Sequence, residues 1–124
     1  MMIDFAIQGV IYAALVGIAD GNVFDRVPAK QSLPYIYIGQ DDFEADYDSA
    51  DLTECTVEVH AFASTRDEVK LIAGQIRAAL DTQLVIPDYL VLEWSYESTR
   101  YITDPDGLTE HAVLQFRYLV GATD

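Results

Sequence analysis

Basic residues and cysteines are both scarce in this chain of 124 residues. It has 7 lysines and arginines against 21 aspartates and glutamates, which leaves a formal net charge of −14. So few cations exclude binding of nucleic acid through its phosphates and attraction to an anionic membrane surface. The single cysteine, Cys55, excludes an intramolecular disulfide, so the fold needs no oxidising compartment.

The N-terminal stretch also lacks the features of a targeting or membrane-spanning segment. Residues 1–19 are apolar, but they include Asp4, and the first basic residue is Arg26, whereas a signal peptide begins with basic residues. Gln8 interrupts a run that is already shorter than the roughly 20 apolar residues of a membrane span. We therefore expect no membrane partner. One domain over residues 1–124 is the expectation, since 51% hydrophobic residues can bury a core.

Helical periodicity is present in two segments. Apolar residues recur at spacings of three and four over residues 3–19, in a stripe so wide that this helix should be buried on several sides. A second helix should follow Thr65, because Thr65 and Glu68 have the spacing of a capping box and an apolar stripe runs from Val69 to Leu80.

Alternation of apolar and polar residues predicts four strands, at residues 33–39, 53–62, 90–101 and 111–120. The last two flank a turn, Asp104-Pro105-Asp106-Gly107, which predicts a hairpin. On its first strand, the side chains expected to share one face are Leu90, Leu92, Trp94 and Tyr96. This order of elements predicts an α+β domain, with a mostly antiparallel sheet, a helix packed on one face and an N-terminal helix.

Residues 40–52 form an acidic segment without lysine or arginine. Its charged and large aromatic side chains are Asp41, Asp42, Phe43, Glu44, Asp46, Tyr47, Asp48 and Asp51. Self-repulsion favours an extended, solvated segment, which is either a long loop or the tip of a hairpin. A calcium loop of the EF-hand type is excluded, because Tyr47 and Thr53 occupy positions six and twelve when counted from Asp42. The segment is then a solvated loop or, as the sharper hypothesis, a partner-binding loop.

No catalytic or metal-binding pattern is apparent. His60 and His111 fall on different predicted strands and lack the spacing of a metal motif, so surface or interface positions are expected for them. Cys55 alternates with valines on a core face, as a small buried hydrophobe does, and has no basic neighbour to activate it as a nucleophile. We therefore expect no enzyme activity, no cofactor and no metal.

Several motifs resemble those of one protein family in their order and spacing. They are residues 23–28 followed by 33–39, a strand ending in His60-Ala61-Phe62 before the second helix, and the Asp-Pro-Asp-Gly turn between Arg100 and Phe116-Arg117. Together they resemble the tail completion, or tail terminator, proteins of long-tailed phages and of phage-like gene transfer agents. The resemblance covers nearly the whole chain.

The resemblance implies a structural function without an active site. Proteins similar to lambda's terminator are α+β subunits that form a hexameric ring, which caps the tail tube, ends its growth and joins the tail to the head connector. The implied partners are further copies of the chain, the tail tube protein and the connector or stopper protein, and DNA passes through the hole without specific binding. The implied location is the head-proximal end of the virion tail, after assembly in the host cytoplasm.

Two surfaces are candidate contacts in such a ring. We expect the first helix to contact another subunit through Phe5, Val10, Ala13 and Gly17. We expect the acidic segment to become ordered on the tube or the connector. Two other classes of function stay open: an acidic mimic of DNA that inhibits a nucleic-acid-binding protein, and a small oligomeric α+β enzyme.

Overall fold

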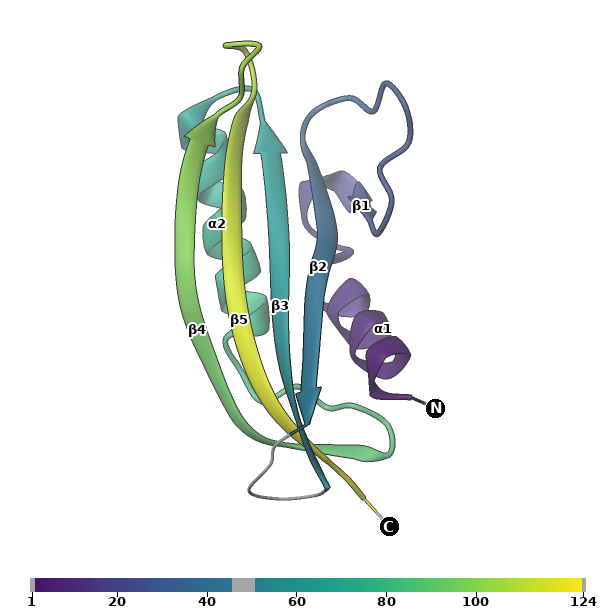
Figure 1. Ribbon diagram of the computed structural model, residues 1–124. Coiled ribbons are helices and arrows are strands. Elements are labelled where there is room, and N and C mark those ends of the chain that lie inside the picture. The colour runs from purple at the N-terminus through teal and green to yellow at the C-terminus, as the bar shows by residue number, and fades with distance from the viewer. Residues whose placement is uncertain (1, 46–50, 124) are drawn as a thin grey trace.

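A computed structural model describes residues 2–45 and 51–123 (Figure 1). Its helices and strands follow in the order α1 (Ile3–Leu15), a short 3-10 turn (Ala19–Gly21), β1 (Val23–Phe24), β2 (Tyr35–Ala45), β3 (Leu52–Ala63), α2 (Arg66–Leu80), β4 (Tyr89–Thr103) and β5 (Glu110–Ala122). The five strands form one sheet in the order β1-β2-β3-β5-β4. The pair β1–β2 is parallel and the other pairs are antiparallel, so the predicted α+β fold is confirmed.

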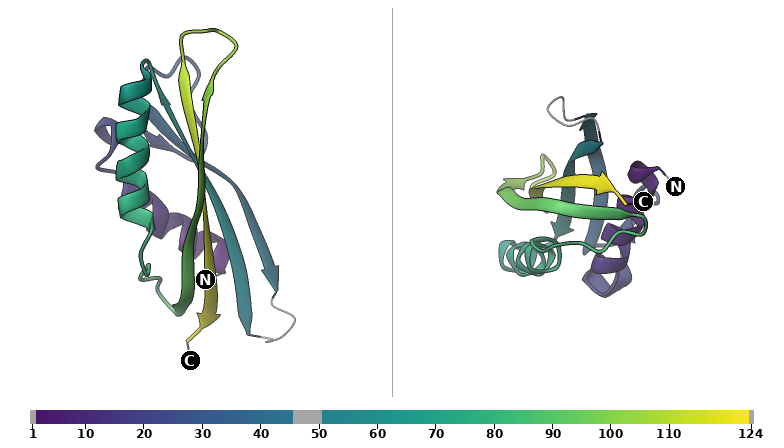
Figure 2. Two further views of the ribbon diagram at one scale, coloured as in Figure 1. Left: turned by 90° about the vertical axis from the view of Figure 1, so that its left-hand side faces the viewer. Right: turned by 90° about the horizontal axis from the view of Figure 1, so that it is seen from below.

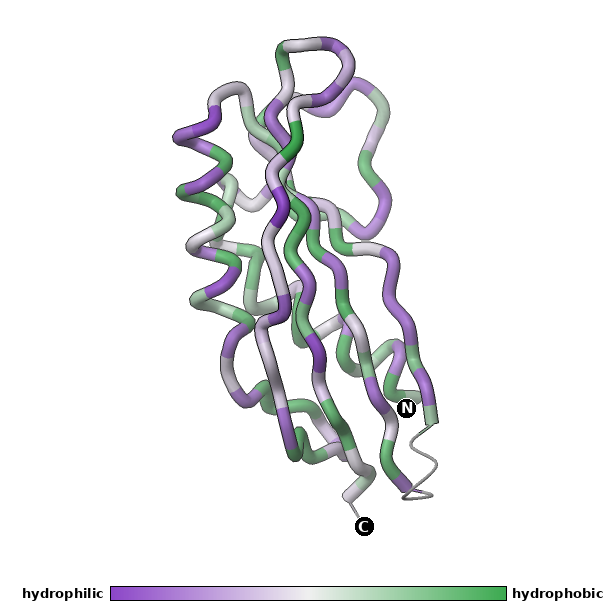
Figure 3. The backbone as a smooth tube through the Cα atoms, turned by 60° about the vertical axis from the view of Figure 1, so that its left-hand side comes forward, coloured by the Kyte–Doolittle hydropathy of each residue, from purple (hydrophilic) through white to green (hydrophobic). Residues whose placement is uncertain are grey.

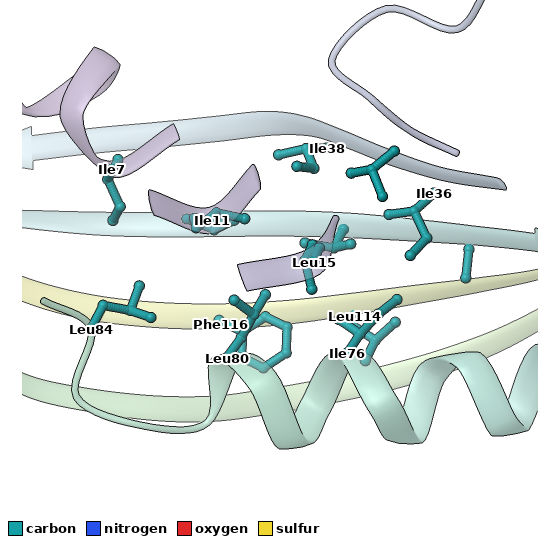
Figure 4. Packing of buried hydrophobic residues seen from close by; sticks show 14 of the residues in the cluster. Ile7, Ile11, Leu15, Ile36, Ile38, Ile76, Leu80, Leu84, Leu114 and Phe116 are labelled. Carbon is teal, nitrogen blue, oxygen red and sulfur yellow. The ribbon is translucent and has the colours of Figure 1, made fainter. Parts of the chain in front are cut away.

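Both helices pack on the same face of the twisted sheet, and the other face is open (Figure 2). Along β3 and β5, every second residue is fully or almost fully buried, and the hydropathy of the chain alternates in the same way (Figure 3). Ile7 and Ile11 of α1 and Ile76 of α2 belong to the same apolar core as Phe116 of β5 (Figure 4). We call the two sides of the sheet the helix-covered face and the open face.

The second helix forms where its sequence predicts. Thr65 precedes α2, and its hydroxyl accepts a hydrogen bond of 3.1 Å from the backbone N–H of Glu68, as the capping-box spacing requires. The predicted apolar stripe is buried, from Val69 to Leu80. At the end of the helix, the hydroxyl of Tyr118 donates a hydrogen bond to the carbonyl oxygen of Leu80, which fastens α2 to β5.

The first helix is shorter than its periodicity suggests. It ends at Leu15, four residues before the predicted end at Ala19. The chain then reverses through three consecutive residues with positive φ, Ala19, Asp20 and Gly21. That reversal brings Val23 alongside Ile36, so the pairing of β1 with β2 overrides the helical periodicity of the last turn.

Bulges in β4 make one prediction about its faces wrong. The register of β4 against β5 shifts between Val91 and Glu93 and again between Tyr96 and Ser98. Because a bulge exchanges the faces beyond it, Val91 is buried on the helix-covered face and Leu90 lies on the opposite side from Trp94. Tyr96 faces Phe116 of β5 across the hairpin, with the two rings 5.8 Å apart and edge to face.

The turn of this hairpin is held by Asp106 and Gly107. The Asp106 carboxylate accepts hydrogen bonds from the backbone N–H groups of Leu108 and Thr109, at 2.8 and 2.9 Å. These bonds lower the pKa of the Asp106 carboxyl. Gly107 has a φ of 69°, which a residue with a side chain adopts at a cost. The acidic turn therefore sets the geometry of the reversal.

Candidate assembly surfaces

The outer side of α1 presents an apolar stripe to solvent. The helix turns Ile7 and Ile11 into the core, whereas Phe5, Tyr12 and Val16 have exposed fractions of 67%, 45% and 41%. These three side chains recur at spacings of seven and four, which puts them on one side of a helix. We call them the α1 surface. Contiguous apolar patches on a soluble chain are characteristic of sites of association.

Two hollows flank Phe5. One has a volume of about 590 Å³ and lies between α1 and β1, where Tyr12, Phe24 and Asp25 help to line it. The other has a volume of about 360 Å³ and lies between α1 and the segment before β4, against Pro87. Phe5 therefore forms a ridge between two depressions, a shape that suits docking against another protein surface.

The predicted interface residues of the first helix fall on this side only in part. Phe5, Ala13 and Gly17 are exposed, and Val10 is partly buried against the core. Tyr12 and Val16 were not among the predicted residues, although helical spacing from Phe5 could have found them. Contact of this helix with another subunit stays a prediction.

The acidic segment is strand in the part that the structure describes. β2 continues through Asp41, Phe43 and Glu44 to Ala45 and pairs with β3, so the expectation of a long loop over residues 40–52 was wrong here. Backbone pairing, together with packing of Phe43 against the core opposite Cys55, outweighs repulsion among the carboxylates. Residues 46–50, which include Asp46, Tyr47 and Asp48, lie outside the described residues. The alternative of a hairpin tip therefore stays a prediction for them.

Asp41 differs from the other carboxylates of β2 because it is only partly exposed. Its Oδ1 atom is buried and accepts no hydrogen bond. Burial first, and then the charges of Asp42 and of Asp4 on α1, raise the pKa of its carboxyl. Negative charge is therefore concentrated where the first turn of α1 meets β2, beside the α1 surface.

The open face brings the two histidines together. The Nδ1 atom of His60 on β3 lies 2.7 Å from the Nε2 atom of His111 on β5. The other ring nitrogen of each histidine faces a carboxylate: His60 Nε2 lies 2.7 Å from Glu58, and His111 Nδ1 lies 3.5 Å from Asp104. Phe62 stacks on the His111 ring at 4.1 Å. The sequence interpretation treated the histidines as isolated, and no local signal could join residues on different strands.

The contact between the two rings needs one shared proton. One of the facing nitrogens donates and the other accepts, so protonating both rings fully would place two N–H groups against each other. Burial first, and then the charge of His60, lower the pKa of His111, while Asp104 opposes this shift. A positive charge on His111 is therefore disfavoured while the two rings are in contact.

Two further possibilities were a reactive Cys55 thiol and a metal site. Burial raises the pKa of the Cys55 thiol to about 12, and a thiol of this kind is unreactive, as expected for a core residue. Among residues 2–45 and 51–123, no group of three histidine, cysteine, aspartate or glutamate side chains could hold a metal ion. In the same part of the chain, no helix is long and apolar enough to cross a membrane.

Comparison with known proteins identifies one family and one fold. The sequence matches the family described as tail completion protein gp17 over residues 10–121. No curated protein sequence matches the chain. Its structure is similar to a chain in the virion of a native gene transfer agent particle, with a TM-score of 0.82 and 19% identity, covering 97% of this chain and 98% of that one. It is also similar to gp17 of bacteriophage SPP1, with a TM-score of 0.58 and 21% identity over 97% and 90% of the two chains.

Proposed function

The chain belongs to the tail completion protein gp17 family and is a structural protein of a phage-type tail, and we propose that six copies of it form a ring. The ring caps the head-proximal end of the tail tube, ends its growth and joins the tail to the head connector. The observation that carries this proposal is the family match over residues 10–121, which includes α2, the second half of α1 and all strands except the last residue of β5. The resemblance noted in the sequence is thereby confirmed at the level of the family.

The α1 surface supports assembly into a ring. Phe5, Tyr12 and Val16 expose large apolar side chains in a chain with a formal charge of −14. Burial of such side chains against another copy would remove them from water at about 25 cal/mol for each Å² of apolar area. The ring therefore has a physical driving force that acts against the repulsion between acidic copies.

The charge of the ring suits passage of DNA. Six copies at −14 each carry a formal charge of −84. An acidic lumen repels phosphates and lets DNA slide without binding, although ions screen this repulsion beyond about 8–10 Å.

The acidic end of the β2–β3 hairpin is the proposed contact with the tail tube or the connector. Asp42 and Glu44 are exposed at the end of β2, and Asp51 is exposed just before β3. We expect hydrogen exchange of this hairpin end to slow when tail tubes or connectors are added to the free protein. Exchange rates that do not change when tail tubes or connectors are added would contradict this contact.

Electron microscopy of the purified protein mixed with tail tubes tests the ring itself. We expect one ring at one end of each tube, tubes of limited length when the protein is present during polymerisation, and a native mass of six chains. Only monomers, both free and on tubes, would contradict the proposal. Capture by basic DNA-binding proteins in place of tubes would favour an acidic mimic of DNA instead.

A further inference from the structure

The open face carries a row of four titratable side chains in contact one after another: Glu58, His60, His111 and Asp104. We call it the histidine row. We propose that the row holds one positive charge between its two carboxylates and is a pH-sensitive switch that fastens the turn of the β4–β5 hairpin to the open face. The row lies within a single chain, so this inference is independent of the ring.

Three contacts in the row use the four ring nitrogens of its two histidines. His60 Nε2 lies 2.7 Å from Glu58 Oε1, and His111 Nδ1 lies 3.5 Å from Asp104 Oδ1. Because a carboxylate only accepts hydrogen bonds, each of these two outer nitrogens needs a proton. The two inner nitrogens lie 2.7 Å apart and need one proton between them, since one donates and the other accepts. The full set of contacts therefore takes three protons.

Three protons on four ring nitrogens amount to one positive charge. Two neutral imidazole rings carry only two protons, so every neutral arrangement leaves one of the three contacts without a donor. Two charged rings carry four protons, which places the two inner N–H groups against each other. All three contacts are therefore satisfied only when one ring is charged and the other is neutral.

His111 is the neutral ring of the pair. Burial first, and then the charge of His60, lower the pKa of His111. Its Nδ1 atom then donates to Asp104, and its Nε2 atom accepts from the Nδ1 atom of His60. His60 carries a proton on both nitrogens, and its contact with a carboxylate is the shorter one, 2.7 Å against 3.5 Å.

The surroundings of the row come from several elements of the sheet. Its titratable, charged and polar neighbours outside the row are Tyr35 and Tyr37 of β2, Arg100 of β4 and Gln115 of β5. Arg100 disfavours a positive charge on His111, which Asp104 favours. Gln115 donates to the Oε2 atom of Glu58 at 3.4 Å, so Oε1 serves His60. The four side chains of the row are 13–29% exposed, so solvent supplies and removes the proton.

Asp104 connects the row to the hairpin turn. Its backbone N–H donates to the carbonyl oxygen of Thr109 at 2.9 Å, and its carbonyl oxygen accepts from the N–H of Gly107 at 2.9 Å. Loss of the third proton removes the donor from one contact of the row, and a fourth proton forces the two rings apart. Either change weakens the connection between the turn and β3. The turn should therefore be most ordered in the state with three protons.

Nitrogen NMR of the histidine side chains tests the proton count. The nitrogen chemical shift distinguishes a ring nitrogen that carries a proton from one that does not, and the titration covers the histidine range. We expect an intermediate state in which both nitrogens of His60 and the Nδ1 atom of His111 carry protons, while the Nε2 atom of His111 carries none. A single step from two neutral to two charged rings would overturn the proposal. So would a neutral His111 with its proton on Nε2.

Two amide variants change the proton count in a defined way, because an amide donates as well as accepts. In Glu58→Gln, the amide can donate to His60 Nε2, so two protons satisfy the row and we expect it to bind one proton fewer. In Asp104→Asn, the amide can donate to His111 Nδ1, so the proton of this ring should move to Nε2. Protonation patterns unchanged from the wild type in both variants would contradict the proposed row.

Glu54→Gln is the matched control for these variants. Glu54 lies on the same strand as Glu58, but it pairs with Arg117 and not with a histidine. The protonation of both rings should be the same in this variant as in the wild type. A change as large as that in Glu58→Gln would show that the effect comes from the overall charge of the chain.

Hydrogen exchange of the Asp104 amide tests the switch itself. After correction for the intrinsic pH dependence of exchange, we expect the protection of this amide to be greatest in the three-proton state and to fall on both sides of it. In Glu58→Gln, where two neutral rings satisfy the row, protection should persist when the third proton is absent. Protection that does not follow the titration in the wild-type protein would overturn the switch.

Discussion

The same strands form the helix-covered face and the open face of the sheet, but the two faces carry different kinds of side chain. Towards the helices, β3 and β5 present side chains such as Val59 and Phe116, which are fully buried and apolar. Away from the helices, they present acids, a base and histidines that contact one another, such as Glu54 with Arg117. One face excludes water and the other satisfies its polar groups pairwise.

This difference determines where stability arises and what can change it. Burial of apolar side chains depends little on pH or salt, whereas paired charges and histidines respond to both. We therefore expect substitutions on the helix-covered face to have large effects under all conditions. Substitutions on the open face should have small effects that vary with the solution.

Phe116→Ala should have the largest effect. The ring is fully buried between α2 and the sheet and contacts Tyr96, so its removal leaves a cavity, and we expect a loss of about 3–5 kcal/mol in the free energy of unfolding. Urea denaturation measures this loss. Gln115→Ala, one residue away on the open face, is the control. A loss of stability for Phe116→Ala no larger than that for Gln115→Ala would contradict the expected difference between the two faces.

The histidine pair should have an intermediate effect that depends on pH. The lowered pKa of His111 means that the unfolded chain binds the proton more readily than the folded one. The stability that neutral His111 contributes is therefore present above the ordinary histidine pKa of about 6.5 and is lost as the pH falls through the lowered folded value. Glu58, His60, Asp104 and Arg100 are the charged or titratable groups that surround this site.

His111→Gln measures this contribution. We expect the wild-type protein to be more stable than the variant at about pH 7.5 and the difference to shrink by about pH 5.5, within the histidine range. Urea denaturation at both pH values gives the difference, and Gln115→Ala should show none of this pH dependence. A difference that stays constant, or widens at the lower pH, would contradict a lowered pKa.

Arg117→Ala should have the smallest effect. The Arg117 Nε atom lies 3.0 Å from Glu54 and its Nη1 atom lies 3.7 Å from Glu93, but these side chains are partly exposed to water. We expect a loss under about 1 kcal/mol at low salt, and a smaller one at high salt, because ions screen exposed pairs. Denaturation of both proteins at the two salt concentrations measures it. An effect as large as that of Phe116→Ala would show that the open face also determines stability.

Local features of the fold could be predicted because they depend on neighbouring residues. The cap of α2 needs only Thr65 and Glu68, and the turn of the β4–β5 hairpin needs only Asp106 and Gly107. The buried side of β3 follows from strict alternation. The α1 surface could also have been found in full, since Tyr12 repeats the helical spacing of Phe5.

Features that depend on pairing between strands could not be predicted. The bulges of β4 move Leu90 away from the face of Trp94, because the register against β5 shifts twice. The strand character of Asp42 and Glu44 depends on the partners that β3 provides. In both cases hydrogen bonds to a distant segment override the preference of the local sequence.

The sequence by itself determined the class of fold and the family, because periodicity, caps and turns are properties of adjacent residues. Only the tertiary structure decided which side chains meet. His60 and His111 are 51 positions apart, and one step of slip between β3 and β5 would place them on opposite faces. The same holds for the hollow beside Phe5 of α1, which is lined by Pro87 and Asp88 from the distant segment before β4.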